Sequence, residues 1–301
     1  MRKLAALATV AIVAAGCGSS GGAPTTTTAS SPKSHRPLRV TRVGSLPQAF
    51  SKAAAAALPH GQMMVLGGYT GAGSLDTILA GPPSHLRVVG RLPQPTHDAA
   101  AAALAGSVYL FGGGETVSMP SVVRISPAGG SAAEAPALGE PLSDLGAVAI
   151  AGSAYLVGGY TGTQFASAIL RYRPQGATTV VARLPHGTRY AGVAVVGGTI
   201  YVAGGLTTAG ATRAVYAVTP GGVVRRVATL PAPEDHAALA VLADHLYLVG
   251  GRRVLAIDPQ SGKVSLAARL PNSLSDPTAT TVGRRIIVTG GGTNGVWALT
   301  G

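Results

Sequence analysis

Polar side chains recur at one position of a repeating pattern, and these residues are the ones that could do chemistry. Six glycine doublets follow one another along the chain, and a polar residue or pair lies 14 to 15 residues before each doublet. Carboxylates, imidazoles and cations gathered at one opening could bind a small polar ligand or a peptide. Equally, such residues could cap turns and meet water, and the sequence leaves both interpretations open. The candidate binding residues are Lys52, His97, Asp98, Asp144, Arg189, Asp235, His236 and Asp276.

No catalytic or metal-binding motif accompanies this set. No Gly-Lys-Ser/Thr follows a strand as in a phosphate-binding loop, and no Gly-x-Ser-x-Gly elbow has matching partners. The adjacent His and Asp pairs at 97–98 and 235–236 lie three repeats apart, whereas a metal site needs clustered ligands. We therefore expect no catalytic residue, no metal and no cofactor.

The repeats that must position the candidate residues are the clearest pattern in the chain. An apolar triplet ends on each doublet, and a Leu-Pro pair precedes most doublets by 19 or 20 residues. Periods of 40 to 50 residues are typical of propellers and solenoids. Each repeat has the pattern of four short strands, the first of them rich in small side chains. The doublets begin at Gly67, Gly112, Gly158, Gly204, Gly250 and Gly290.

The apolar triplet, the double glycine, a third strand and the Leu-Pro boundary together resemble the kelch repeat. The resemblance covers residues 38–301 and implies an all-β, six-bladed kelch-type β-propeller. The last copy ends in third-strand register at 296–299, while 38–43 has the pattern of a fourth strand. We therefore expect the N-terminal segment to complete the last blade and close the ring.

Tyrosines occur at two positions of the repeat. One set lies inside the second strand and is expected in the core. Tyr69 and Tyr160 follow their doublets, where they could stack on a ligand or pack on a neighbouring blade. The expected core tyrosines are Tyr109, Tyr155, Tyr201 and Tyr247.

The first residues have the pattern of an export signal. A basic start and an apolar run occupy residues 1–16, and Cys17 is the only cysteine. Ala15 and Gly16 before Cys17 resemble the lipobox of bacterial lipoproteins, which implies lipidation of that cysteine. Residues 17–37 are rich in Gly, Ser, Thr and Pro, as flexible tethers are. We expect an exported protein, lipid-anchored to the outer face of the cell membrane; the alternative is an ordinary cleaved signal.

Composition narrows the range of partners. A mean hydropathy of +0.35 argues against general disorder. The net charge of +12 could suit nucleic acid, but export removes the chain from that partner. The scattered arginines could instead favour an anionic lipid or wall polymer, or simply keep the domain soluble.

These observations predict a membrane-anchored extracytoplasmic propeller that acts as a protein or ligand interaction module. We expect a monomer with a protein or peptide partner in the cell envelope, because sugar sites need more exposed aromatic rings than this chain offers. The alternative is an envelope carbohydrate-active enzyme with its site at the channel mouth. It would be a hydrolase, or similar to the sialic acid mutarotases among kelch propellers.

Overall fold

The computed structural model describes residues 37–128 and 131–301. The expected signal peptide, Cys17 and nearly all of the tether lie outside these residues. The described chain is all-β, and within it no helix is long and apolar enough to cross a membrane.

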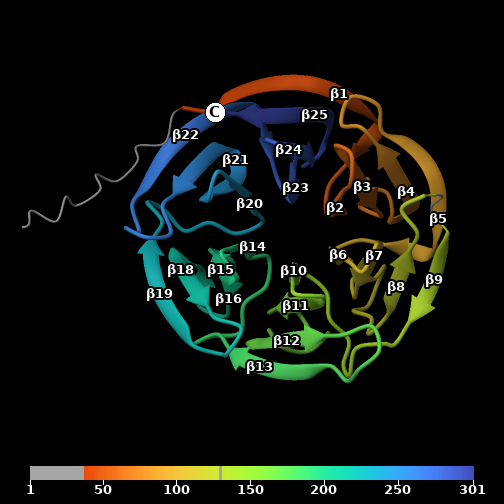
Figure 1. The fold of residues 1–301 in the computed structure, drawn as a ribbon, viewed down its shortest axis with the longest axis horizontal. Helices are drawn as coiled ribbons and strands as arrows, with labels where there is room; N and C mark the ends of the chain where they lie inside the picture. The colour runs from red at the N-terminus through yellow and green to blue at the C-terminus, as the bar shows by residue number, and fades with distance from the viewer. Residues whose placement is uncertain (1–36, 129–130) are drawn as a thin grey trace, which may run out of the picture. The chain divides into compact units, whose positions relative to one another are not determined.

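Six sheets stand around a central channel as the blades of a propeller, and the chain visits them in sequence order (Figure 1). In each blade the first strand lies innermost and antiparallel neighbours follow outward. Blade 1 contains β2 (Ala54–Leu58), β3 (Gln62–Leu66), β4 (Leu75–Gly81) and β5 (Arg87–Thr96). Blade 2 contains β6 (Ala100–Leu104), β7 (Ser107–Phe111), β8 (Val122–Ile125) and β9 (Ala132–Ala135). Blade 3 contains β10 (Gly146–Ile150), β11 (Ser153–Val157), β12 (Ala168–Tyr172) and β13 (Thr179–Arg183).

The fourth and fifth blades vary this plan. Blade 4 contains β14 (Gly192–Val196), β15 (Thr199–Ala203), β18 (Ala214–Val218) and β19 (Val224–Thr229), with a small ribbon of β16 (Leu206–Thr207) and β17 (Gly210–Ala211). Blade 5 contains β20 (Ala238–Leu242), β21 (His245–Ile257) and β22 (Val264–Leu274). Here β21 covers both the second and the third strand expected from the sequence, since 245–249 pairs with β20 and 251–257 with β22. Only Arg252 and Arg253 separate the doublet from Val254, so the connection between the two halves is short.

The two ends of the chain close the ring in blade 6. Its sheet runs from β23 (Pro277–Val282) through β24 (Arg285–Gly290) and β25 (Thr293–Thr300) to β1 (Arg39–Phe50) on the outside. β1 is antiparallel to β25, with Arg39 opposite Thr300 and Arg42 opposite Trp297. The predicted closure by the N-terminal segment is therefore confirmed.

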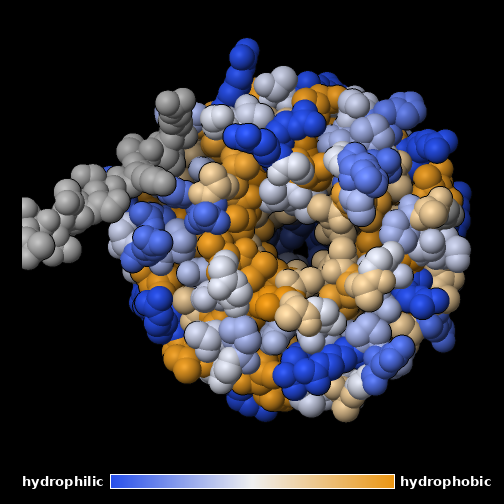
Figure 2. Space-filling view, in the orientation of Figure 1, coloured by the Kyte–Doolittle hydropathy of each residue, from blue (hydrophilic) through white to orange (hydrophobic). Residues whose placement is uncertain are grey.

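Small side chains on the inner strands leave the channel open. It holds a cavity of about 390 Å³ lined mostly by alanine and valine, for example Ala55, Ala101, Ala147, Val193 and Val241. Figure 2 shows the central opening bordered by apolar side chains, with hydrophilic ones farther out. The blades pack on each other through larger residues, and the four expected core tyrosines are 4% to 7% exposed.

The glycine doublets of blades 1 to 4 pack against the segment that enters the next blade. Gly158 has a φ of 61°, and a Cβ on it would lie 2.2 Å from the carbonyl oxygen of Thr188. The N–H of Gly159 donates to that same oxygen at 2.8 Å. Blades 1, 2 and 4 repeat both features with Thr96, Leu142 and Glu234. A side chain at the first glycine would separate two blades.

This packing predicts different costs for two glycine substitutions. We expect Gly158→Ala to destabilise the protein by about 3 kcal/mol, because the methyl group meets backbone. Gly152 has a φ of 75° but no atom within 4 Å of a built Cβ, so Gly152→Ala should cost only about 1 kcal/mol. Denaturant unfolding of both variants measures the difference. Equal losses would contradict the packing role of the doublet.

Closure by β1 predicts that the propeller depends on its N-terminal segment. Deleting Leu38 to Leu46 should unfold or aggregate the protein, because it exposes the edge of β25 and removes two buried leucines. A deletion of equal length in the tether, from Thr25 to Lys33, is the control. Thermal melting that is the same for the first deletion as for the control would show that the ring closes without β1.

Candidate functional site

Six residues, one from each blade, form a ring where the inner strands begin. All six have a left-handed backbone, with φ between 52° and 57°. The N–H of Asp98 donates to the carbonyl oxygen of Lys52 at 3.0 Å, and that of Asp144 to Asp98 at 2.7 Å. The same bond joins Tyr190 to Asp144, Asp276 to His236 and Lys52 to Asp276 at 2.9 to 3.1 Å. We call this set the mouth ring: Lys52, Asp98, Asp144, Tyr190, His236 and Asp276.

The left-handed conformation is a backbone requirement of this ring. It costs about 1 to 2 kcal/mol for a residue with a side chain and persists only where the surroundings enforce it. Aspartate, which occupies three of the six positions, tolerates it better than most residues.

Two cavities open at the ring. The first, of about 100 Å³, is lined by the mouth ring and by the residue that follows each member. The second, of about 530 Å³, lies over blades 2 to 4, and we call it the side cavity. It is lined by Asp98, Asp144 and Tyr190 of the ring, by His97 and Arg189 and by loop residues such as Ser118 and Thr161.

Most of the candidate residues predicted from sequence meet at these cavities. Lys52, Asp98, Asp144, His236 and Asp276 line the first. His97 and Arg189, one position earlier in the repeat, line only the side cavity. Asp235 lines neither, because its neighbour His236 occupies the ring position of blade 5.

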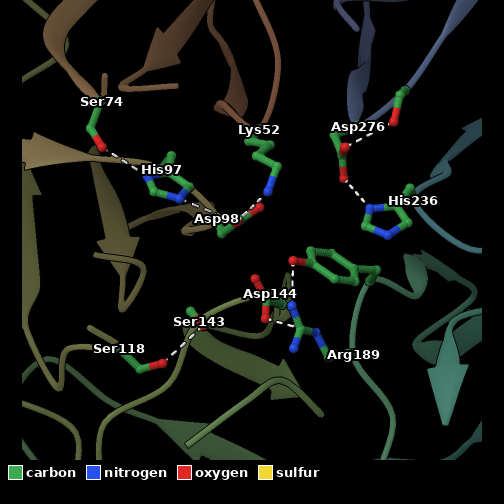
Figure 3. Close-up of polar contacts among 12 residues, drawn as sticks. Lys52, Ser74, His97, Asp98, Ser118, Ser143, Asp144, Arg189, His236 and Asp276 are labelled. Carbon is green, nitrogen blue, oxygen red and sulfur yellow. Dashed lines mark hydrogen bonds and ion pairs between the residues drawn. The ribbon is translucent and has the colours of Figure 1, made fainter. Parts of the chain in front are cut away.

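Lys52 reaches across the opening (Figure 3). Its Nζ lies 3.1 Å from Oδ2 of Asp98 in blade 2 and 5.7 Å from the ring centroid of Tyr190 in blade 4. Burial lowers the pKa of the Lys52 ammonium, but the Asp98 carboxylate outweighs this and leaves the pKa above its ordinary value. Lys52 is thus a fixed cation near the channel axis.

Asp144 is the most deeply buried charged group of the site. Its side chain is 3% exposed, and its Oδ2 lies 3.0 Å from Nε of Arg189. Neither of these two atoms makes a hydrogen bond of normal geometry. The contact is therefore an ion pair in which the N–H of Arg189 Nε does not point at the carboxylate oxygen. Burial raises the pKa of the Asp144 carboxyl to about 6; the nearby Asp98 charge adds to this, while Arg189 and the Tyr190 hydroxyl oppose it. Burial also raises the pKa of Asp98.

Arg189 is held among aromatic rings. Its guanidinium carbon lies 4.4 Å from the ring centroid of Tyr190, 5.0 Å from that of Tyr160 and 5.3 Å from that of Phe165. Its Nη2 also donates to the Tyr190 hydroxyl. These contacts fix the direction of a cation at the edge of the side cavity.

A His–Asp pair occupies the other side of the ring. Nδ1 of His236 lies 2.5 Å from Oδ1 of Asp276, and the His236 ring lies 3.8 Å from that of Tyr190. The hydrogen bond to Asp276 raises the pKa of His236, against the opposing effect of burial. By contrast, burial and the Lys52 charge lower the pKa of His97, whose Nδ1 contacts Ser74 Oγ at 2.8 Å.

Two contributing residues, Tyr190 and Ser118, are not among the predicted site residues. Tyr190 shares the ring position, so the register of the repeat could have identified it. Ser118 contacts Ser143 at 3.0 Å. It lies in a loop whose length and composition differ from those of the corresponding loops in the other repeats, so the repeat pattern does not identify it. Tyr69 packs against His97 and Tyr160 against Arg189, each in the next blade, so both contact neighbouring repeats.

Among residues 37–128 and 131–301, no group of three or more His, Cys, Asp or Glu side chains could hold a metal ion. The site instead offers paired charges and hydroxyl groups, which can bind polar groups and exchange protons.

The fold and this ring define a six-bladed β-propeller with a charged channel mouth. No protein-family model and no curated protein matches the sequence. A solved structure described as "Structure of YjhT" is similar, with a TM-score of 0.73 over 85% of this chain and 95% of that one. The two sequences are 16% identical, so this similarity supports the propeller fold alone.

The raised pKa of Asp144 predicts a pH dependence of stability. An unfolded aspartate ionises near pH 3.8 and this one near 6, so the folded state binds more protons between these values. Stability should therefore fall as pH rises from about 4 to 6, by up to about 3 kcal/mol from this group. Asp144→Asn should flatten this decline in denaturant titrations, and Asp244→Asn on an exposed turn should not. Parallel wild-type and Asp144→Asn curves would contradict the assignment.

Proposed function

We propose that this chain is an exported, lipid-anchored kelch-type propeller that binds a protein or peptide partner at its channel mouth. The observation that carries this proposal is the convergence of side chains from all six blades on one opening. Lys52, Arg189 and their carboxylate partners are held in place by ion pairs and ring contacts before any ligand arrives. Fixed donors and acceptors reduce the entropy that binding costs.

The two cavities suit different parts of such a partner. The first, about 100 Å³, fits a single polar side chain or a chain end, which Lys52 and the ring carboxylates can bind. The side cavity, about 530 Å³, extends the contact over the loops of blades 2 to 4. Val117, at 71% exposure, adds an apolar contact among its lining residues.

The anchoring part of the proposal rests on the sequence. Cys17 carries the lipid, and the tether to Pro37 holds a monomeric propeller at the outer face of the membrane. The mouth then meets partners of the cell envelope.

The ionisable groups of the site favour a second function, that of an enzyme. A carboxyl group with a pKa of about 6 and a His–Asp pair are groups that can exchange protons near neutral pH. They support the alternative of a carbohydrate-active enzyme, similar to a sialic acid mutarotase or a hydrolase.

Capture from envelope extract tests the binding proposal. The protein is purified in mild detergent as wild type, as Arg189→Ala, as Asp144→Asn and as the control Arg284→Ala, which lies in a turn at the other end of blade 6. We expect one partner to be retained by wild type and control and lost by at least tenfold from the mouth variants, because a buried charge contact is removed.

Two outcomes would overturn this proposal. One is that the mouth variants retain the same proteins as wild type. The other is that no protein is retained while the wild type catalyses anomer exchange of sialic acid, followed by proton NMR, and Asp144→Asn does not. That second result would establish the enzyme.

A further inference from the structure

Charge is distributed unevenly between the two ends of the propeller. We call the end that carries the mouth ring and the loops after the doublets the mouth face. The turn face is the opposite end, where turns join first to second and third to fourth strands. Seven of the 11 carboxylates lie in the loops of the mouth face, and an eighth, Asp76, is the second residue of β4, which begins there. They are Asp76, Asp98, Glu115, Glu140, Asp144, Glu234, Asp235 and Asp276.

The turn face has the opposite character. Six cations lie in its turns or at the adjoining strand ends, together with two carboxylates, Asp244 and Asp258. Six cations less two carboxylates give these groups a net charge of +4. Asp258 accepts hydrogen bonds from the N–H groups of Gln260 and Ser261, so it is committed to its own turn. The six cations are Arg39, Arg87, Arg173, Lys263, Arg284 and Arg285, all of them exposed.

These cations are not used to hold the fold together. Each of the six ion pairs within the described residues involves a carboxylate of the mouth face, such as Lys52 with Asp98 or Arg253 with Glu234. In that part of the chain, none of the six turn-face cations lies within ion-pair distance of a carboxylate. Unpaired exposed cations on one face remain available to an external anionic surface.

The chain leaves the propeller on the same face. β1 begins at Arg39, opposite Thr300 near the C-terminus, and outer strands run from the turn face toward the mouth. Pro37, the first residue described, therefore lies at the turn face, next to blade 6. Arg39, Arg284 and Arg285 belong to this blade. Lys263 belongs to blade 5, whose Ala267 in β22 accepts a hydrogen bond from the N–H of Leu38, so four of the six cations lie on the two blades nearest the tether (Figure 1).

We propose that the turn face binds the anionic surface of a lipid bilayer and thereby directs the channel mouth away from the membrane. The lipid anchor, which belongs to the proposed function, supplies the setting, whereas the charge interaction is a property of the propeller itself. A tether that emerges among cations keeps this face close to the membrane, and cations that come within the Debye length of the surface, about 8 to 10 Å, attract acidic headgroups. The mouth face lacks this attraction, because cations such as Lys52, Arg189 and Arg253 are paired there with carboxylates.

Vesicle sedimentation tests this binding. The full chain carrying Cys17→Ser, which cannot be acylated there, is mixed with phosphatidylcholine vesicles with or without phosphatidylglycerol. Vesicles without the anionic lipid measure any contribution of the apolar N-terminal run. We expect the bound fraction to rise with phosphatidylglycerol and to fall as salt is added.

Two matched triple variants locate the binding face. Arg87→Glu, Arg284→Glu and Arg285→Glu together should weaken binding to anionic vesicles by about tenfold or more. The control carries Arg183→Glu, Arg252→Glu and Arg269→Glu, three exposed residues nearer the mouth face, with the same change in net charge. Its binding to anionic vesicles should stay close to that of the Cys17→Ser protein. Thermal melting confirms that both triple variants fold.

The proposal is overturned if both triple variants lose binding equally, because net charge alone then explains it. It is also overturned if binding does not depend on phosphatidylglycerol, or if anionic vesicles bind the turn-face variant undiminished. Because the turn-face variant leaves the mouth residues unchanged, partner capture by it reports on the proposed function separately.

Discussion

A chain of backbone hydrogen bonds around the channel mouth is the constraint on which this structure depends. At five of the six junctions the N–H of a ring residue donates to the carbonyl oxygen of the ring residue in the blade before, and the bond from Lys52 to Asp276 joins the first blade to the last. To make these bonds, residues with side chains adopt a left-handed backbone. In blades 1 to 4 the glycine doublets complete the contact by letting the entry segment of the next blade approach closely.

This geometry also explains why the site is charged. A residue in the ring must direct its side chain toward the channel opening, where six of them lie close together with limited water. Charges in such a place need partners: within the ring Lys52 pairs with Asp98 and His236 with Asp276, and Arg189, one position before the ring, pairs with Asp144. Asp144 is buried beside a second carboxylate, so its pKa is raised to about 6. The fold thus provides a set of fixed charges that a ligand can exploit.

The two ends of the propeller differ because its topology sends different segments to each. The mouth face receives the long loops and the ring, where carboxylates are paired with cations. Short turns form the other end, and there the cations remain unpaired and the tether departs. A ligand site at one end and a membrane contact at the other are compatible in a single small domain.

The number of blades, the strand order and the closure can all be predicted from the sequence, because each repeat carries its own apolar triplet and glycine doublet and these patterns are local. The sequence also predicts that five of the six ring residues lie together. These residues are Lys52, Asp98, Asp144, His236 and Asp276. They lie together because residues at the same position of each repeat lie at the same height along the axis of a closed propeller. The partners of these residues, by contrast, follow from the folded arrangement. His236 pairs with Asp276 of the next blade and not with its neighbour Asp235, and Lys52 spans the opening toward Tyr190. Such pairings depend on distances between blades and on side-chain direction, which no repeat encodes alone.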